Sequence, residues 1–198
     1  MNPFLPERLH RGVVLASRSP RRADILTGLG FEFDVDPASE EVEQQVSYED
    51  AFALPEELAR RKCAQVAARR RDEIVIAADT VVILGDEILT KPGSDEEAVG
   101  FLRKLSGQTH TVVTGVAVEH GAALASGAEH TRVTFRELSE ADIAGYVATG
   151  EGRDKAGSYA AQGIGAGLIR RIDGCYFNVV GLPVSLLIDL LKEVAVER

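Results

Sequence analysis

Short apolar runs alternate with amphipathic segments through the first half of the chain. The pattern predicts a buried strand at residues 12–16, a helix at residues 20–28 and a second strand at residues 31–35. An acidic, irregular stretch covers residues 36–54, and the helical pattern returns over residues 55–71. Strands that alternate with helices in this order predict an α/β fold.

The middle of the chain carries an apolar run with a polar break. Residues 74–78 and 81–84 are apolar and rich in β-branched side chains, and Asp79 and Thr80 separate them. This pattern predicts a buried strand interrupted by polar groups. A bare carboxylate is costly to bury, so Asp79 must be hydrated, hydrogen-bonded or bound to a cation, and we expect it to line a cleft. The alternative is an aspartate that only starts a turn.

The rest of the chain is richer in strands. Caps, glycines and alternating apolar positions divide it into further elements. The predictions are a helix over residues 94–105 with a capping box at Ser94 and Glu97, long hairpin strands at residues 109–120 and 123–136, a helix from Ser139 that ends before Gly150, a glycine-rich segment at residues 150–167, strands at residues 168–172 and 176–180, and a terminal helix at residues 184–194.

Composition and charge limit the classes of function. The chain has 198 residues, of which 45% are apolar, and this is enough for one domain or two intimate lobes with a core. The net charge of −9 argues against a nucleic-acid polymer as partner, whereas a compact cationic pocket can still hold one nucleotide. No apolar run approaches the roughly 20 residues that cross a bilayer, and the first residues lack the order of a signal peptide. We therefore expect no membrane partner and a cytoplasmic location.

Cysteine and histidine show no metal-site pattern. Cys63 and Cys175 lie far apart without clustered partners, which favours reduced, packed thiols over a zinc site or a disulfide. The histidines are scattered without the spacing of metal ligands, so none is assigned a role: His10, His110, His120 and His130.

Residues 17–22 (SRSPRR) follow the first predicted strand directly and offer donors to a polyanion. Hydroxyls and guanidiniums lie where a helix begins at Pro20, and a helix N-terminus already favours negative charge. We interpret the stretch as a phosphate-binding turn. The alternative is an ordinary helix start with solvated arginines.

Other charged and glycine-rich segments leave two interpretations open. The cations of the helix at residues 55–71 are typical of a solvated face, and Lys62 alone is pursued further. The loop at residues 154–157 (DKAG) suits either a loop that closes over an anion or a plain surface loop. Residues 163–167 (GIGAG) lack the ending of a P-loop and precede a strand pattern, so we expect close backbone approach there.

Six blocks cover nearly the whole chain in a fixed order: residues 15–22 (LASRSPRR), 77–82 (AADTVV), 91–92 (KP), 105–110 (LSGQTH), 154–157 (DKAG) and 178–183 (NVVGLP). Together they closely resemble the Maf family of nucleoside triphosphate pyrophosphatases. The resemblance implies one Maf-like domain over residues 1–198, with an α/β fold similar to that of the inosine-triphosphate pyrophosphatases. Such a fold has a mixed central sheet flanked by helices and two lobes with a nucleotide cleft between them.

The resemblance also implies an activity and a set of site residues. The expected enzyme hydrolyses a nucleoside triphosphate to its monophosphate and pyrophosphate with a divalent cation, Mg²⁺ or Mn²⁺. The family's proton acceptor and metal ligand matches Asp79. The family's phosphate-binding and specificity positions, with its two lysines, match Ser17, Arg21, Arg22, Lys62, Thr80, Lys91 and Gln162.

Within the family, the subgroup that acts on dTTP and UTP is most similar, because Gln162 occurs together with Arg21 and Thr80. The subgroup that acts on 7-methyl-GTP resembles residues 158–163 less. A carboxamide presents a donor beside an acceptor, which complements the N–H and carbonyl of uracil or thymine. The family also has an acidic residue in the loop before the second helix, and spacing does not decide between Glu40, Glu41 and Glu43.

Other functions remain open at this level. A nucleotide-binding regulator of cell division or septum formation, with little turnover, would use the same cationic cleft. A second alternative is an enzyme that cleaves the terminal phosphate, and a third is an acidic scaffold for basic proteins. Apolar residues 175–180 and the terminal helix could support a homodimer.

Overall fold

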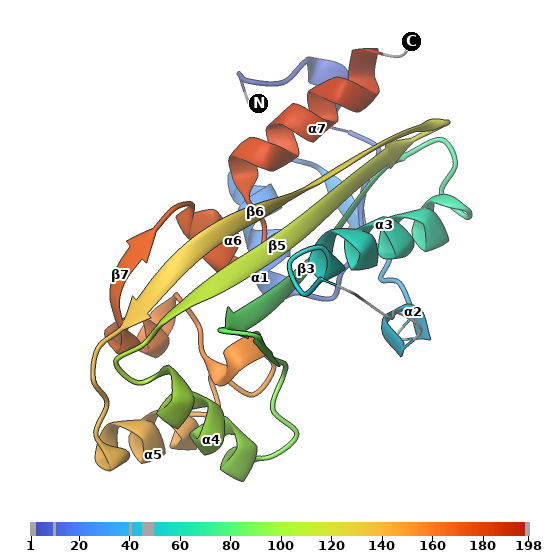
Figure 1. Cartoon of the computed structure of the whole chain (residues 1–198). Coiled ribbons are helices and arrows are strands. Elements are labelled where there is room, and N and C mark those ends of the chain that lie inside the picture. Colours follow the sequence, from blue (N-terminus) through green and yellow to red (C-terminus); the bar gives the residue numbers. More distant parts are fainter. Residues whose placement is uncertain (1–2, 10, 40, 45–49, 197–198) are drawn as a thin grey trace. The chain divides into compact units, whose positions relative to one another are not determined.

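The computed structural model describes residues 3–9, 11–39, 41–44 and 50–196 and divides the chain into two compact units. Unit 1 comprises residues 1–79, 114–129 and 181–198, and unit 2 comprises residues 80–113 and 130–180. Three strands contribute residues to both units (Figure 1): β3 (Ile74–Leu84), β5 (Thr109–His120) and β6 (Ala123–Phe135).

Unit 1 additionally holds two short strands and most of the longer helices. Its further elements are η1 (Glu7–Leu9), β1 (Val13–Leu15), α1 (Pro20–Gly28), β2 (Phe33–Val35), α2 (Glu41–Gln44), α3 (Leu54–Ala67) and α7 (Val184–Val196). Proline at the first position of α1 is compatible with the helix because that N–H has no partner within the helix. Helix α1 begins at Pro20 and ends at Gly28, as the sequence predicts.

Unit 2 contains shorter elements joined by loops. They are β4 (Glu87–Leu89), α4 (Asp95–Leu105), α5 (Glu140–Ala148), η2 (Ala156–Ser158), η3 (Gly163–Leu168), β7 (Ile169–Asp173) and α6 (Tyr176–Val180). Ser139 and Asp142 form the reciprocal capping box of α5. At α4 the Ser94 hydroxyl accepts the Glu97 N–H, whereas the Glu97 carboxylate accepts the N–H of Gly93 instead of completing the box with Ser94.

The sheet is mixed, with the strand order β2-β1-β3-β5-β6-β7 and β4 beside β3. Strand β1 pairs in parallel with β2 and β3, while β4 and β7 pair antiparallel with their neighbours. In unit 1, apolar side chains of α3 pack on alternate residues of β1 and β3; this cluster includes Val14, Ala59, Cys63, Val66 and Val75. The predicted α/β class, with a mixed sheet flanked by helices, is confirmed.

Three predicted elements differ from the structure. The helix predicted over residues 55–71 ends at Ala67. Strand β3 runs without interruption through Asp79 and Thr80, so Asp79 neither breaks a strand nor starts a turn. Residues 176–180 form the helix α6 and not a strand, because the Val179 N–H reaches back to the Cys175 carbonyl and the Asn178 side chain is anchored in the interior. A run of five residues with four apolar side chains does not distinguish the two conformations.

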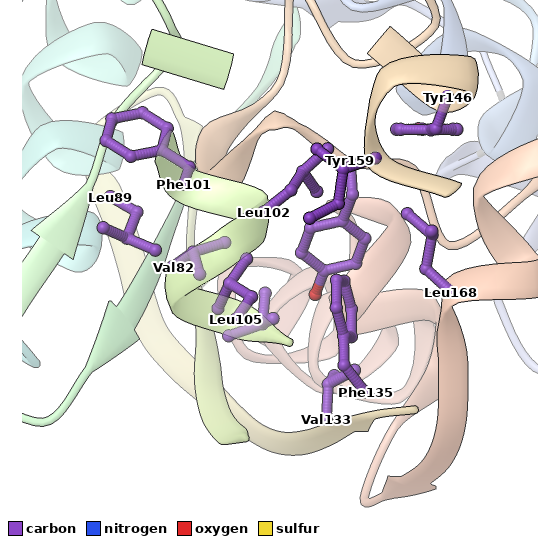
Figure 2. Packing of buried hydrophobic residues seen from close by; sticks show 12 residues of the cluster. Val82, Leu89, Phe101, Leu102, Leu105, Val133, Phe135, Tyr146, Tyr159 and Leu168 are labelled. Atoms are coloured by element: carbon purple, nitrogen blue, oxygen red, sulfur yellow. The ribbon is translucent and has the colours of Figure 1, made fainter. Parts of the chain in front are cut away.

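The core of unit 2 is built around an aromatic contact (Figure 2). The rings of Phe135 and Tyr159 meet edge to face with their centroids 4.8 Å apart. Buried side chains of α4 and the surrounding strands enclose them, among them Leu102, Leu105 and Val133. Within the described residues, no helix has the length and apolar character needed to cross a membrane.

Burial of His110 makes folding stability depend on pH. The Nε2 atom of His110 lies 2.7 Å from the Tyr159 hydroxyl oxygen, and burial lowers the imidazole pKa from 6.5 to about 4. Below pH 6.5 the unfolded chain therefore binds a proton that the folded chain does not accept until about pH 4. Stability consequently decreases as the pH falls through this range.

Replacement of His110 by glutamine should flatten the decrease in stability between pH 6.5 and pH 4. The wild-type protein should lose about 3 kcal/mol more than the variant over this range. Denaturant unfolding at a series of pH values measures the difference. The His130→Gln variant, at an exposed position of the same unit, is the matched control and should follow the wild-type curve. Equal slopes for wild type and His110→Gln would contradict the assignment.

Candidate active site

The parallel pairing of β1 with β3 brings two predicted site residues to the same level of the sheet. Leu15 pairs with Ile76, and the Ala16 N–H donates to the Ile76 carbonyl at 2.8 Å. Ser17 follows directly, and Asp79 lies three residues beyond Ile76. In α/β sheets ligands bind where such strands end at their carboxyl side. The end of β1 in unit 1 is therefore the place to look for a site.

Asp79 forms an ion pair with Lys62. The Lys62 Nζ donates to the Asp79 Oδ1 at 2.5 Å, and the two side chains are only 11% and 15% exposed. Lys62 reaches this position from α3, whose apolar face packs on β1 and β3. The pair satisfies the charge of a carboxylate that would be costly to bury alone. Lys62 is therefore a buried cation and differs from its neighbours on the helix.

The neighbouring cations make contacts at the surface. Arg61 pairs with Glu57 one turn earlier on α3. Arg69 and Arg70 both hydrogen-bond the Asp36 carboxylate, and these hydrogen bonds lower the pKa of Asp36 to about 2. On α3 itself Arg61 lies on the solvated face that the charge run predicts, while Lys62 is the exception. Arg69 and Arg70 follow the helix, which ends at Ala67.

Helix α3 lies unusually close to the sheet at one point. Gly115 of β5 faces the backbone of Pro55 and Glu56 in the first turn of α3, and a Cβ atom at Gly115 would collide with it. The absence of a side chain at this position allows the helix to rest on the strand. This contact helps to fix the end of α3 from which Lys62 follows two turns later.

Arg22 is held by two acceptors in unit 1. Its Nε donates to the Gly181 carbonyl at 2.8 Å and its Nη1 donates to the Ser17 Oγ at 2.9 Å. The Ser17 Oγ also accepts the Ser19 N–H at 3.2 Å. Because the Ser17 oxygen acts as acceptor in both bonds, its own proton can be donated to a phosphate oxygen. Arg21, the second residue of α1, is partly exposed beside this group.

Sequence reasoning did not identify the role of Gly181. Its carbonyl orients the Arg22 guanidinium although the two residues are 159 positions apart. Gly181 belongs to the block at residues 178–183, but the contact uses a backbone atom and leaves no side-chain pattern. The φ of +114° at this residue is a conformation that glycine adopts readily, and the glycine itself is the only local signal.

The other predicted site residues belong to unit 2. Thr80 follows Asp79 on β3 and is partly exposed, while Lys91 is exposed just after β4. The carbonyl of Thr90 accepts the Gly157 N–H at 3.1 Å, so Lys91 lies beside the loop at residues 154–157. Gln162 is exposed and directly precedes η3. That these residues converge with Ser17, Arg22, Lys62 and Asp79 stays a prediction.

The charged side chains of the loop at residues 154–157 bond within unit 2. The Lys155 Nζ donates to the Asp154 carboxylate and to the Glu151 carbonyl, and the Lys155 side chain is only 14% exposed. Gly157 adopts a φ of +67° and packs against Val82. Lys155 therefore stabilises the loop to which it belongs.

Among the described residues, no cluster of three or more histidine, cysteine or acidic side chains has the arrangement of a metal site. Glu41 is exposed at the start of α2, and Glu43 belongs to the same short helix. Glu40 and His10 lie outside the described residues. The choice between the three glutamates as loop acid therefore stays open, and Asp79 is the candidate metal ligand that the structure describes in detail.

Comparison with curated proteins gives close matches over most of the chain. A protein of Deinococcus radiodurans named dTTP/UTP pyrophosphatase is 46% identical over 188 residues, covering 95% of both chains. A protein of the same name from Pelotomaculum thermopropionicum is 48% identical over 91% of this chain and 95% of its own. A third, from Pyrococcus furiosus, is 43% identical over 91% and 94%.

Comparison with solved structures gives matches of low sequence identity. The Staphylococcus aureus Ham1 protein is 18% identical, with a TM-score of 0.43 over 65% of this chain and 72% of its own. A dITP/XTP pyrophosphatase from Mycobacterium abscessus is 15% identical with a TM-score of 0.40. The model of the family described as Maf-like protein matches residues 12–194, in agreement with the curated relatives. The chain therefore belongs to the Maf-like protein family.

Proposed function

We propose that this protein hydrolyses dTTP and UTP to the nucleoside monophosphate and pyrophosphate. The observation that carries the proposal is the pairing of a cation with an acceptor at two points beside the end of β1: Arg22 with Ser17, and Lys62 with Asp79. Relatives named dTTP/UTP pyrophosphatase, 46% and 48% identical over more than nine-tenths of this chain, support the same substrates.

The cations would neutralise the triphosphate. Arg22 is already oriented by Gly181 and Ser17, so binding requires little reordering of its side chain. The first turn of α1 adds backbone N–H groups and the positive end of a helix dipole. Arg21, Lys62 and Lys91 supply the remaining charge. Positioning and charge compensation account for most of the catalysis of phosphoryl-group reactions.

Asp79 would act on the attacking water. Its carboxylate orients the water and accepts one of its protons while the water oxygen bonds to phosphorus. The anhydride bond between the α- and β-phosphates breaks, and its electron pair leaves with the pyrophosphate. Lys62 donates a hydrogen bond to the Asp79 Oδ1. It holds the carboxylate in place and compensates its negative charge while Asp79 is deprotonated.

A divalent cation fits this set of donors. Mg²⁺ is usually held by one or two carboxylates and completes its coordination with water and substrate phosphates. A partly exposed Asp79 without a cluster of further acidic ligands among the described residues matches that pattern better than it matches a site made wholly of protein ligands. Asp79 would hold the ion, which when bound would lower the pKa of a coordinated water.

Base selection would depend on Gln162 together with Arg21 and Thr80. The exposed Gln162 carboxamide offers a donor and an acceptor to the N3–H and O4 of thymine or uracil. A site built to pair both groups disfavours bases that leave one of them unpaired. The cytoplasmic location, the homodimer and the cleft between two lobes stay predictions.

The test is to incubate the protein with dTTP and Mg²⁺ and to follow the products by phosphorus NMR. We expect dTMP and pyrophosphate in equal amounts from dTTP, and UMP and pyrophosphate in equal amounts from UTP. Release of orthophosphate would contradict the proposal in favour of an enzyme that cleaves the terminal phosphate. Binding of dTTP without any product would favour the nucleotide-binding regulator.

A further inference from the structure

Two side chains near the end of α5 hold the segment on both sides of Gln162. The Glu151 Oε1 accepts the Ile164 N–H at 3.0 Å, and the Glu151 Oε2 accepts the Gly165 N–H at 2.7 Å. The Tyr146 hydroxyl oxygen accepts the Ala160 N–H at 3.0 Å. The backbone is therefore fixed two residues before Gln162 and again two and three residues after it.

The two holding side chains are themselves connected. The Tyr146 hydroxyl and the Lys155 charge both act to lower the pKa of the Glu151 carboxyl group. Burial on its own raises the pKa of Glu151, but the N–H groups of Gly165 and Ile164, with the Tyr146 hydroxyl, outweigh it and leave the pKa below its ordinary value. At neutral pH the group is thus a carboxylate that accepts from the Ile164 and Gly165 N–H groups.

The close fit of this arrangement depends on glycines. A Cβ atom at Gly163 would collide with the Glu151 carboxylate, and one at Gly165 would collide with the Tyr146 hydroxyl and the Ala160 backbone. Gly163 also has a φ of +61°. The segment passes so near to Glu151 and Tyr146 that only residues without a side chain are accommodated. Gln162, between these fixed points, keeps an exposed side chain.

We propose that Glu151 and Tyr146 are positioning residues: they fix the backbone that carries Gln162, set the position from which its carboxamide meets the base, and so determine the preference for thymine and uracil over cytosine. The inference rests on the proposed function. Thymine and uracil present an N3–H donor and an O4 acceptor, whereas cytosine presents an N3 acceptor and an N4 amino donor. A carboxamide that turns over by 180° exchanges its donor and acceptor and would then fit cytosine.

Discrimination between these bases therefore requires a Gln162 carboxamide that can reach the base in one orientation only. Three N–H hydrogen bonds fix the backbone on both sides of Gln162, and this limits the positions from which the carboxamide can reach the base. Loss of these bonds would let the segment move and admit the reversed orientation. The expected effect is on the ratio of kcat/KM for dTTP to kcat/KM for dCTP, more than on hydrolysis itself.

The experiment measures pyrophosphate release from dTTP and from dCTP by four variants and the wild type. Glu151→Gln keeps the shape but replaces one acceptor oxygen by a donor, and should lower the dTTP to dCTP ratio about tenfold. Tyr146→Phe should lower it about threefold. Gln162→Ala should lower it at least as much as Glu151→Gln. The matched control, Glu140→Gln, changes an exposed glutamate that pairs with Arg103 and should leave the ratio unchanged.

A double variant separates positioning from a general structural effect. If Glu151 acts through Gln162, adding Glu151→Gln to Gln162→Ala should not change the ratio further. An unchanged ratio in Glu151→Gln, or an equal decrease in the presence and absence of Gln162, would overturn the inference while leaving the proposed function intact. If Glu151→Gln fails to fold, as judged by circular dichroism, the same cycle is run with Tyr146→Phe. A wild-type protein that releases no pyrophosphate would refute the proposed function itself, and the inference with it.

Discussion

Replacement of Asp79 by asparagine abolishes pyrophosphate release from dTTP while it leaves nucleotide binding largely intact. The amide has nearly the shape of the carboxylate but cannot accept the proton of the attacking water, and it is a poorer ligand for a divalent cation. We expect kcat to decrease at least about a hundredfold. Binding should persist because the variant keeps the cations proposed to bind the phosphates, and the Lys62 ammonium no longer has an anionic partner.

Steady-state kinetics and calorimetric titration with dTTP measure the two effects separately. The matched control is Asp86→Asn, in the exposed turn that follows β3, and its kcat should equal that of the wild type. A kcat for Asp79→Asn within a few-fold of the wild-type value would remove Asp79 from the mechanism. A lost affinity for dTTP with unchanged kcat would make Asp79 a binding residue only.

Replacement of Lys62 by methionine lowers both activity and stability. Methionine has a similar length, but it leaves the Asp79 carboxylate, whose side chain is only 15% exposed, without the ammonium that it accepts from. The unpaired carboxylate should reduce the free energy of unfolding by about 2 kcal/mol. Loss of a cation from the phosphate site should reduce kcat/KM about a hundredfold.

An exposed ion pair of equal length provides the comparison. Lys104 and Glu87 also lie 2.5 Å apart, but both side chains are about half exposed, so Lys104→Met should change neither property appreciably. Chemical denaturation and dTTP hydrolysis are measured for both variants. If the Lys62 and Lys104 variants lose equal stability, burial of the Lys62–Asp79 pair has no energetic consequence and our account of it is wrong.

Elements with clear end signals could be predicted closely from the sequence. Pro20 at the start of α1 and the Ser139–Asp142 box at the start of α5 fix their helices, because those residues bind or spare the N–H groups that a helix leaves unpaired. Helix α6 has no such signal, and its five residues, four of them apolar, suit a strand equally well. Its conformation depends on tertiary hydrogen bonds of Asn178 to Val112 and Thr131.

The candidate site could be predicted only in part. Asp79 stands out in the sequence because a carboxylate between apolar runs requires a partner. The identity of that partner does not follow from the pattern, since Lys62 is one of several cations on α3 and only packing of the helix buries it. Gly181 acts through its backbone carbonyl, and Glu151 accepts hydrogen bonds from backbone N–H groups. Neither role can be predicted from residue type or spacing.

The bare backbone of Gly115 has a consequence for variation within the fold. Because α3 touches β5 there without an intervening methyl group, any larger residue must lift the amino-terminal end of the helix or tilt it. Either movement would change the position of the Lys62 ammonium group, which lies 2.5 Å from the Asp79 carboxylate. The effect of substitutions at Gly115 on activity would therefore show how closely the distance between Lys62 and Asp79 must be kept.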